Sequence, residues 1–203
     1  MIVSMLPALA PYIIYIHGFN SSPASFKAAY LKSYLTRTGY AESYLAPALD
    51  YCPQRAIEQL CELIEQYLSK FNITLIGSSL GGYYATYLTE KYGVNSVLIN
   101  PAVAPYRMMA QALGQQHNYH TQQTYEITQR EVDQLRQIEQ LELTDPSKYL
   151  VLLQTGDDTL DYREAAHKYA NSTLIIRQGG SHGFDHFDQA VPDILHFAGL
   201  AIN

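Results

Sequence analysis

The alternation of short apolar segments with longer amphipathic ones is the feature that most constrains the fold of this sequence. Strand-like apolar runs occupy residues 12–16, 43–46, 73–76, 96–100, 150–154 and 173–177. Helix-like segments occupy residues 25–37, 54–71, 80–92, 162–169 and 187–199. Strands that alternate with helices at this spacing predict an α/β fold. We expect a mostly parallel sheet of about six or seven strands with helices on both faces.

One stretch, residues 102–147, breaks this rhythm because it contains no strand-like run. Gln-rich pieces come first, and a charged helical segment at residues 128–141 follows. Thr128 and Glu131 have the spacing of a capping box at the start of that helix. Long insertions in compact domains are usually lids or mobile loops. We therefore expect a lid-like insertion within one domain spanning residues 1–203, and a surface excursion without a role in substrate choice is the alternative.

Composition narrows the class of protein. A chain of 203 residues suits one domain with a substantial core. The formal net charge of -6 disfavours nucleic acid as a partner. No apolar stretch reaches the roughly 18 residues of a membrane span, and the start of the chain is a poor signal peptide. We expect a cytoplasmic protein with reduced Cys52 and Cys61, which lack the spacing of a zinc site.

The pattern Gly77-x-Ser79-x-Gly81 lies between a predicted strand and a predicted helix. That is the setting of a nucleophile elbow, in which a serine hydroxyl sits on a sharp strand-to-helix turn. Glycines two residues before and after the serine avoid Cβ collisions with the neighbouring elements. The pattern predicts Ser79 as a nucleophile, whereas a glycine-rich connecting loop is the alternative for the motif alone.

An oxyanion hole would accompany such a nucleophile. It is formed by the backbone N–H after the serine and by a second N–H from the loop after an early strand. Leu80 supplies the first of these groups and Phe19 is our choice for the second. His17 precedes the nucleophile in the chain, so we expect it to support the loop rather than act as the general base.

The remaining catalytic groups should follow in the order acid, then histidine, each after a later strand. Asp157 is the preferred acid, since Leu160 can anchor its loop, while Asp158 is the alternative and Asp161 suits a helix cap. His182 follows the last strand in a glycine-rich loop and is the predicted general base. His186 lies nearby, in the expected first turn of the last helix.

Substrate contacts are predicted from proximity to these groups. Tyr83, Tyr106 and Phe19 lie next to the expected machinery and could line the substrate site. Core and rim packing is the simpler role for most aromatic residues. Arg107 could bind an anionic group such as a coenzyme A phosphate, or it could pair with a nearby acid.

With these residues in place, the chain resembles the α/β hydrolase superfamily, and more narrowly the small bacterial esterases of the YqiA/YcfP type. The resemblance covers nearly the whole chain and rests on the segments at residues 17–22, 77–83, 100–103, 154–162 and 180–184. It implies a carboxylic ester hydrolase acting on short acyl esters, with acyl-CoA thioesters as a further possibility. Asp158 stands where we expect Glu in this pattern.

The predicted reaction is acyl transfer from a small-molecule ester or thioester to Ser79, followed by hydrolysis. His182 would accept the Ser79 proton and Asp157 would orient the imidazole. This chemistry requires no metal or organic cofactor. The alternatives are an acyl-CoA thioesterase with the same triad and a non-catalytic binding protein of this fold; the sequence leaves the oligomeric state open.

Overall fold

A six-stranded parallel sheet forms the centre of the computed structural model, which describes residues 9–200. All five strand pairs are parallel. Across the sheet the strands follow the order β2 (Tyr44–Leu45), β1 (Ala10–Ile16), β3 (Phe71–Ser78), β4 (Asn95–Ile99), β7 (Tyr149–Gln154) and β8 (Thr173–Arg177). The predicted α/β fold is confirmed, and the six predicted strands correspond to these six.

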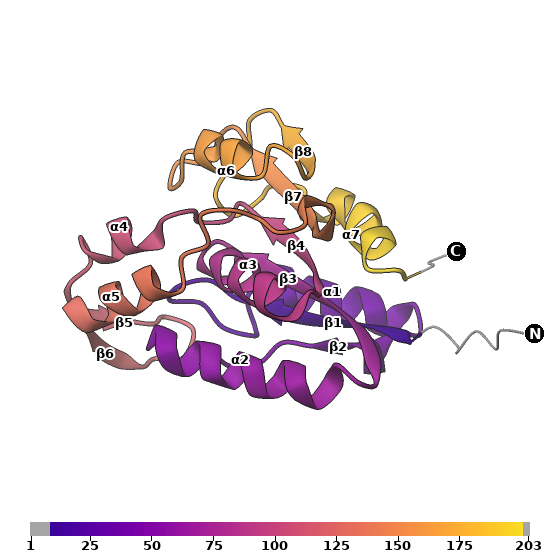
Figure 1. The fold of residues 1–203 in the computed structure, drawn as a ribbon, viewed down its shortest axis with the longest axis horizontal. Coiled ribbons are helices and arrows are strands. Elements are labelled where there is room, and N and C mark those ends of the chain that lie inside the picture. The colour runs from indigo at the N-terminus through magenta and orange to yellow at the C-terminus, as the bar shows by residue number, and fades with distance from the viewer. Residues whose placement is uncertain (1–8, 201–203) are drawn as a thin grey trace, which may run out of the picture.

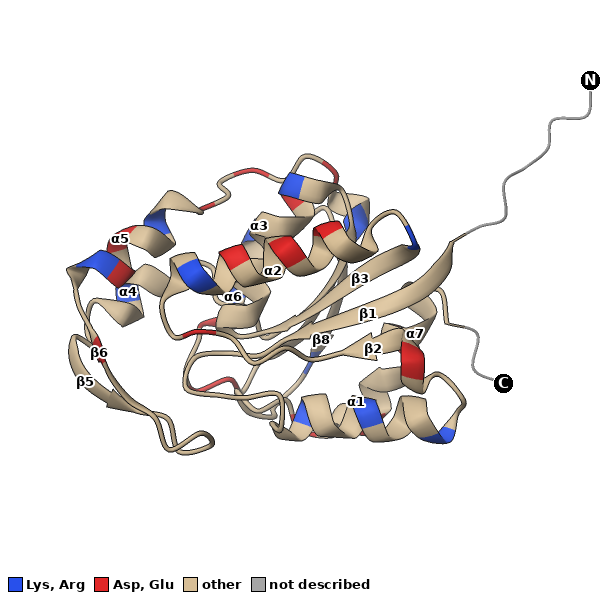
Figure 2. Ribbon diagram, turned by 90° about the horizontal axis from the view of Figure 1, so that it is seen from below, with Lys and Arg blue, Asp and Glu red and all other residues tan. Residues whose placement is uncertain are grey.

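Helices cover both faces of the sheet (Figure 1). One face packs against α2 (Pro53–Tyr67), α3 (Leu80–Tyr92) and α6 (Tyr162–Lys168). The other packs against α1 (Phe26–Arg37) and α7 (Val191–Phe197). Coverage on both sides explains why strands such as β7 are apolar throughout rather than alternating. Figure 2 shows the charged residues mainly on the helices and loops, while β1 and β3 carry none.

The insertion differs from its prediction. After α4 (Pro105–Met109), an antiparallel hairpin joins β5 (Gly114–His117) to β6 (Thr124–Ile127). The expectation of no strand in this stretch is therefore wrong. A hairpin whose strands pair only with each other needs few apolar residues, and only Tyr125 and Ile127 of its strands are buried. Such a short signal is hard to recognise in a polar sequence.

The end of the insertion follows its prediction more closely. Helix α5 (Gln129–Gln137) begins with the expected capping box, in which the Thr128 N–H donates to Glu131 Oε2 at 2.8 Å. The helix ends four residues before the expected boundary at residue 141. The predicted helix at residues 187–199 is divided into a 3-10 turn (Phe187–Ala190) and α7. Two further 3-10 turns occupy Ala41–Ser43 and Pro146–Lys148.

Candidate active site

Ser79 lies on the sharp turn between β3 and α3 with φ 54° and ψ -119°. Positive φ is costly for a residue other than glycine, so the surrounding structure must hold it. The Ser79 N–H donates to Ile99 O at 3.1 Å, and the Ser79 carbonyl accepts from the N–H groups of Gly82 at 2.9 Å and Ala102 at 3.1 Å. These bonds fix the serine at the carboxyl end of the sheet.

The two glycines of the motif allow the close approach of neighbouring backbone. A Cβ at Gly81 would lie 2.0 Å from the carbonyl oxygen of Ile16, and one at Gly77 would lie 2.3 Å from the Gly81 oxygen. Non-bonded carbon and oxygen atoms cannot approach each other so closely. The Gly77-x-Ser79-x-Gly81 pattern therefore has a steric cause in this fold.

Hydrogen bonds join Ser79, His182 and Asp157 in one line. The distance from His182 Nε2 to Ser79 Oγ is 3.0 Å, and that from His182 Nδ1 to Asp157 Oδ2 is 2.8 Å. Since a carboxylate only accepts, Nδ1 carries the proton and Nε2 is free to accept from the serine hydroxyl. The Asp157 side chain is 1% exposed and that of His182 is 26% exposed. The predicted residues from three distant segments thus meet at one place.

Asp157 remains ionised in this position. Its other oxygen, Oδ1, accepts the backbone N–H groups of Leu160 at 2.8 Å and Thr159 at 2.9 Å. Burial alone would raise the pKa of Asp157, but the hydrogen bonds from His182, Leu160 and Thr159 outweigh it and lower the pKa below its ordinary value. A carboxylate that stays charged can stabilise an imidazolium.

The alternative carboxylates lie elsewhere. Asp158 is exposed, and its side chain accepts a bond from the Thr159 hydroxyl at 3.4 Å. Asp161 caps α6 by accepting the Arg163 N–H at 3.0 Å, which is the role expected of it. His186 is also exposed. The structure therefore brings Asp157, and neither of its rivals, to His182.

Two buried amide side chains hold the loop that carries His182. Gln154 Oε1 accepts from the N–H groups of Ser181 at 3.0 Å and Asp185 at 2.8 Å, and its Nε2 donates to Asp185 O at 2.8 Å. Asn100 Nδ2 donates to Ser181 O at 3.0 Å, and Asn100 Oδ1 accepts the Gln154 N–H. Sequence reasoning assigned neither residue a role. The available signal was a polar residue directly after or at the end of an apolar strand.

The Phe19 and Leu80 N–H groups have no acceptor among residues 9–200. The loop that carries Phe19 passes close to the serine, because a Cβ at Gly18 would lie 3.2 Å from Ser79 Cβ. His17 anchors this loop: its Nε2 accepts the Leu49 N–H at 3.3 Å and its Nδ1 bonds to Gly18 O at 3.0 Å. The two N–H groups are thus available to a ligand beside Ser79.

An apolar pocket of about 130 Å³ opens beside Ser79. Its walls come from the serine turn, from α4 and the residues around it, and from the loop after β7. The lining residues are Phe19, Ser79, Leu80, Ala102, Pro105, Met108, Met109, Ala112 and Leu160. None carries a charge, so this pocket suits an uncharged apolar group.

Three residues expected to bind substrate lie outside this pocket. Tyr83 is buried and its hydroxyl donates to Leu135 O at 2.8 Å, while the Tyr106 hydroxyl donates to Glu139 Oε1 at 2.8 Å. Arg107 forms an exposed ion pair with Glu164 at 3.1 Å. In this structure all three stabilise the insertion or its contacts with the core, whereas Phe19 does line the pocket.

Two further observations concern residues 9–200. No cluster of three or more His, Cys, Asp or Glu side chains there could hold a metal ion. No helix within that range is long and apolar enough to cross a membrane.

Comparison with known proteins places the chain in a family. Residues 12–199 match the model of UPF0227, described as an uncharacterised protein family. The chain belongs to UPF0227. A UPF0227 protein of Shewanella woodyi is 26% identical over 153 residues, which cover 73% of this chain and 77% of the relative.

Solved structures similar to this UPF0227 member share its fold. Alpha/beta hydrolase domain-containing protein 10 from mouse aligns with a TM-score of 0.69 at 14% identity, covering 94% of this chain and 92% of that one. Est1E from Butyrivibrio proteoclasticus, with ferulic acid bound, aligns with a TM-score of 0.67 at 13% identity, covering 93% and 88%. At such identities the likeness establishes the fold alone, which is that of the α/β hydrolases.

Proposed function

We propose that this protein is a serine esterase that hydrolyses small acyl esters through an acyl-enzyme intermediate. The observation that carries the proposal is the hydrogen-bonded line from Asp157 through His182 to Ser79, with two unpaired N–H groups beside it. A nucleophile, a base, an orienting acid and oxyanion donors together make up the machinery of acyl transfer. Similarity to hydrolases and esterases of the same fold agrees with this reading.

In the first half of the proposed reaction, Ser79 Oγ attacks the ester carbonyl and His182 Nε2 takes its proton. The Phe19 and Leu80 N–H groups stabilise the negative oxygen that forms. His182 then gives the proton to the leaving alcohol as the bond to it breaks, which leaves an ester on Ser79. In the second half, water attacks that ester with His182 as base, and the acid is released.

The apolar pocket limits the length of the acyl chain that the site can accept. Its volume of about 130 Å³ is comparable with a cavity of about 150 Å³ that accommodates benzene in another protein. A chain of a few carbons fits this space, whereas a long fatty acyl chain would have to extend beyond it. Because Arg107 is engaged by Glu164 and no Lys or Arg lines the pocket, we assign an ester rather than an acyl-CoA thioester as the substrate.

A fluorophosphonate probe tests this function directly, since it labels activated serines covalently. We expect the wild-type protein to label and to hydrolyse p-nitrophenyl butyrate. Ser79→Ala should abolish both, and Ser78→Ala, which changes the adjacent buried serine, is the matched control that should retain labelling. If the wild-type protein neither labels nor hydrolyses the ester, it is a binding protein rather than an esterase. Faster turnover of butyryl-CoA than of butyrate esters would favour the thioesterase.

A further inference from the structure

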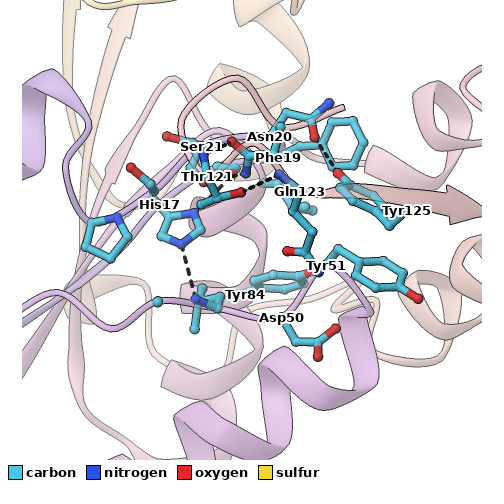
Figure 3. A pocket seen from close by; sticks show the side chains of 17 residues that line it. His17, Phe19, Asn20, Ser21, Asp50, Tyr51, Tyr84, Thr121, Gln123 and Tyr125 are labelled. Atoms are coloured by element: carbon cyan, nitrogen blue, oxygen red, sulfur yellow. Dashed lines mark hydrogen bonds between the residues drawn. The ribbon is translucent and has the colours of Figure 1, made fainter. Parts of the chain in front are cut away.

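A second pocket, of about 50 Å³, shares two lining residues, Phe19 and Leu80, with the apolar pocket. Figure 3 shows the side chains that line this second pocket. Four segments enclose it: residues 17–23, residues 48–51, the start of α3, and the hairpin of the insertion. This volume has room for about three groups the size of a water molecule, since one water needs about 15 Å³ on the same measure. The two residues proposed as oxyanion donors therefore line both the apolar pocket beside Ser79 and this second pocket, whose walls include polar side chains.

The walls of this second pocket are fixed by contacts between the insertion and the core. The Tyr125 hydroxyl donates to Asn20 Oδ1, as Figure 3 shows, and the Tyr125 ring stacks on Tyr51 with 4.3 Å between centroids. Asn118 Nδ2 donates to Ser21 O at 3.0 Å. A pocket held in this way is formed before any ligand arrives, which lowers the entropic cost of binding.

Polar groups without protein partners face this space. Tyr84 is 3% exposed and lines the pocket, and its hydroxyl makes no hydrogen bond to the protein among residues 9–200. The exposed side chain of Gln123 also lines the pocket, and among the described residues its amide makes no hydrogen bond to the protein. A ligand that enters the pocket can therefore hydrogen-bond to the Tyr84 hydroxyl without displacing a bond within the protein.

The lining of the pocket offers no cationic side chain to an anionic ligand. No Lys or Arg lines it, and Asp50 is the one acidic residue that does. Burial lowers the pKa of His17, so its imidazole is neutral at pH 7. Burial, and then the neighbouring Cys52, Tyr83, Tyr125 and Asp50, raise the pKa of Tyr84, so its hydroxyl stays protonated and can donate. The pocket therefore suits an uncharged hydroxyl-bearing group.

We propose that this pocket binds the alcohol half of the substrate, and that this half is a small polyol such as a glycerol or sugar hydroxyl group. The inference rests on the proposed esterase function. The acyl group stays bonded to Ser79 after the first step, so it belongs in the apolar pocket that Ser79 lines. The other half belongs in the second pocket, which shares Phe19 and Leu80 with the first and in which Tyr84 and Gln123 supply its hydrogen bonds.

Two esters that differ only in the alcohol test this assignment. Monobutyrin and propyl butyrate share the acyl group and a three-carbon alcohol, but only monobutyrin has two further hydroxyls. We expect the wild-type kcat/KM to favour monobutyrin by about tenfold, as one or two net hydrogen bonds would give. Tyr84→Phe and the exposed Gln123→Leu should each reduce that ratio about threefold or more. Tyr87→Phe, also on α3 but outside both pockets, should leave the ratio unchanged.

Binding is measured separately on the Ser79→Ala protein, with monobutyrin as the probe. Its titration should shift the NMR signal of the Gln123 side-chain amide saturably. If the wild-type protein is not labelled by the fluorophosphonate, the esterase function is refuted. The binding of monobutyrin to the Ser79→Ala protein is measured independently of that result. The polyol assignment is overturned if the wild-type enzyme is labelled and active but its ratio of kcat/KM for monobutyrin over propyl butyrate is one or less. It is also overturned if neither Tyr84→Phe nor Gln123→Leu changes that ratio.

Discussion

The reacting groups all come from the central sheet, whereas the insertion contributes part of the walls of both pockets beside them. Ser79, Asp157 and His182 each follow a strand of the central sheet, β3, β7 and β8 respectively. The pockets depend on α4 and on the β5–β6 hairpin, which belong to the insertion. If the proposed function holds, the scaffold fixes the chemistry and the insertion adjusts substrate choice, and changes in each region should separate these two properties.

The largest effect should come from the acid. Asp157→Asn keeps the shape of the side chain but favours the wrong imidazole tautomer, so we expect kcat to fall by about 10⁴-fold. Asp158→Asn is the matched control and should change kcat less than about twofold, since exposed Asp158 does not contact His182. Steady-state kinetics with p-nitrophenyl butyrate measure both. A greater loss in the Asp158 variant would reverse the assignment of the acid.

A smaller effect should come from the support of the His182 loop. Gln154→Met keeps the length of the side chain but leaves the Ser181 and Asp185 N–H groups without their acceptor. We expect kcat to fall roughly 10- to 100-fold at nearly constant KM, and the free energy of unfolding to fall by about 1–3 kcal/mol.

The control for this change is Gln178→Met, on an exposed loop where the amide accepts only from the Thr155 hydroxyl. It should alter neither kcat nor stability appreciably. Gln154 is a positioning residue, so the split between kcat and KM is the decisive readout. A rise in KM without a fall in kcat would mean instead that Gln154 contributes to substrate binding.

The smallest effect should come from the insertion and should concern selectivity alone. Ala112→Leu adds carbon to the wall of the apolar pocket, so we expect the ratio of kcat/KM for butyrate over acetate esters to fall about tenfold. Ala110→Leu, on the exposed side of the same segment, is the control. An equal loss with both esters would show that the insertion affects the reacting groups as well, and the division between the two regions would be lost.

The sequence predicted the scaffold well because its signals are local. Apolar runs located the strands, and the order of strands and helices specified a parallel sheet. It was less informative about the insertion, where the hairpin has only Tyr125 and Ile127 as buried strand residues. Asn100 and Gln154 went unassigned because their partners lie 27 or more positions away along the chain.

By itself, the sequence determined the α/β fold, the strand-to-helix turn at Ser79 and the chain order of Ser79, Asp157 and His182. These follow from periodicity and glycine placement, which depend on neighbouring residues. Only the tertiary structure decided that Asp157 rather than Asp158 reaches His182, that the Tyr83 and Tyr106 hydroxyls bond to groups outside the apolar pocket, and that Phe19 lines two pockets. Such contacts join distant segments, and their geometry depends on how the whole chain packs around the sheet.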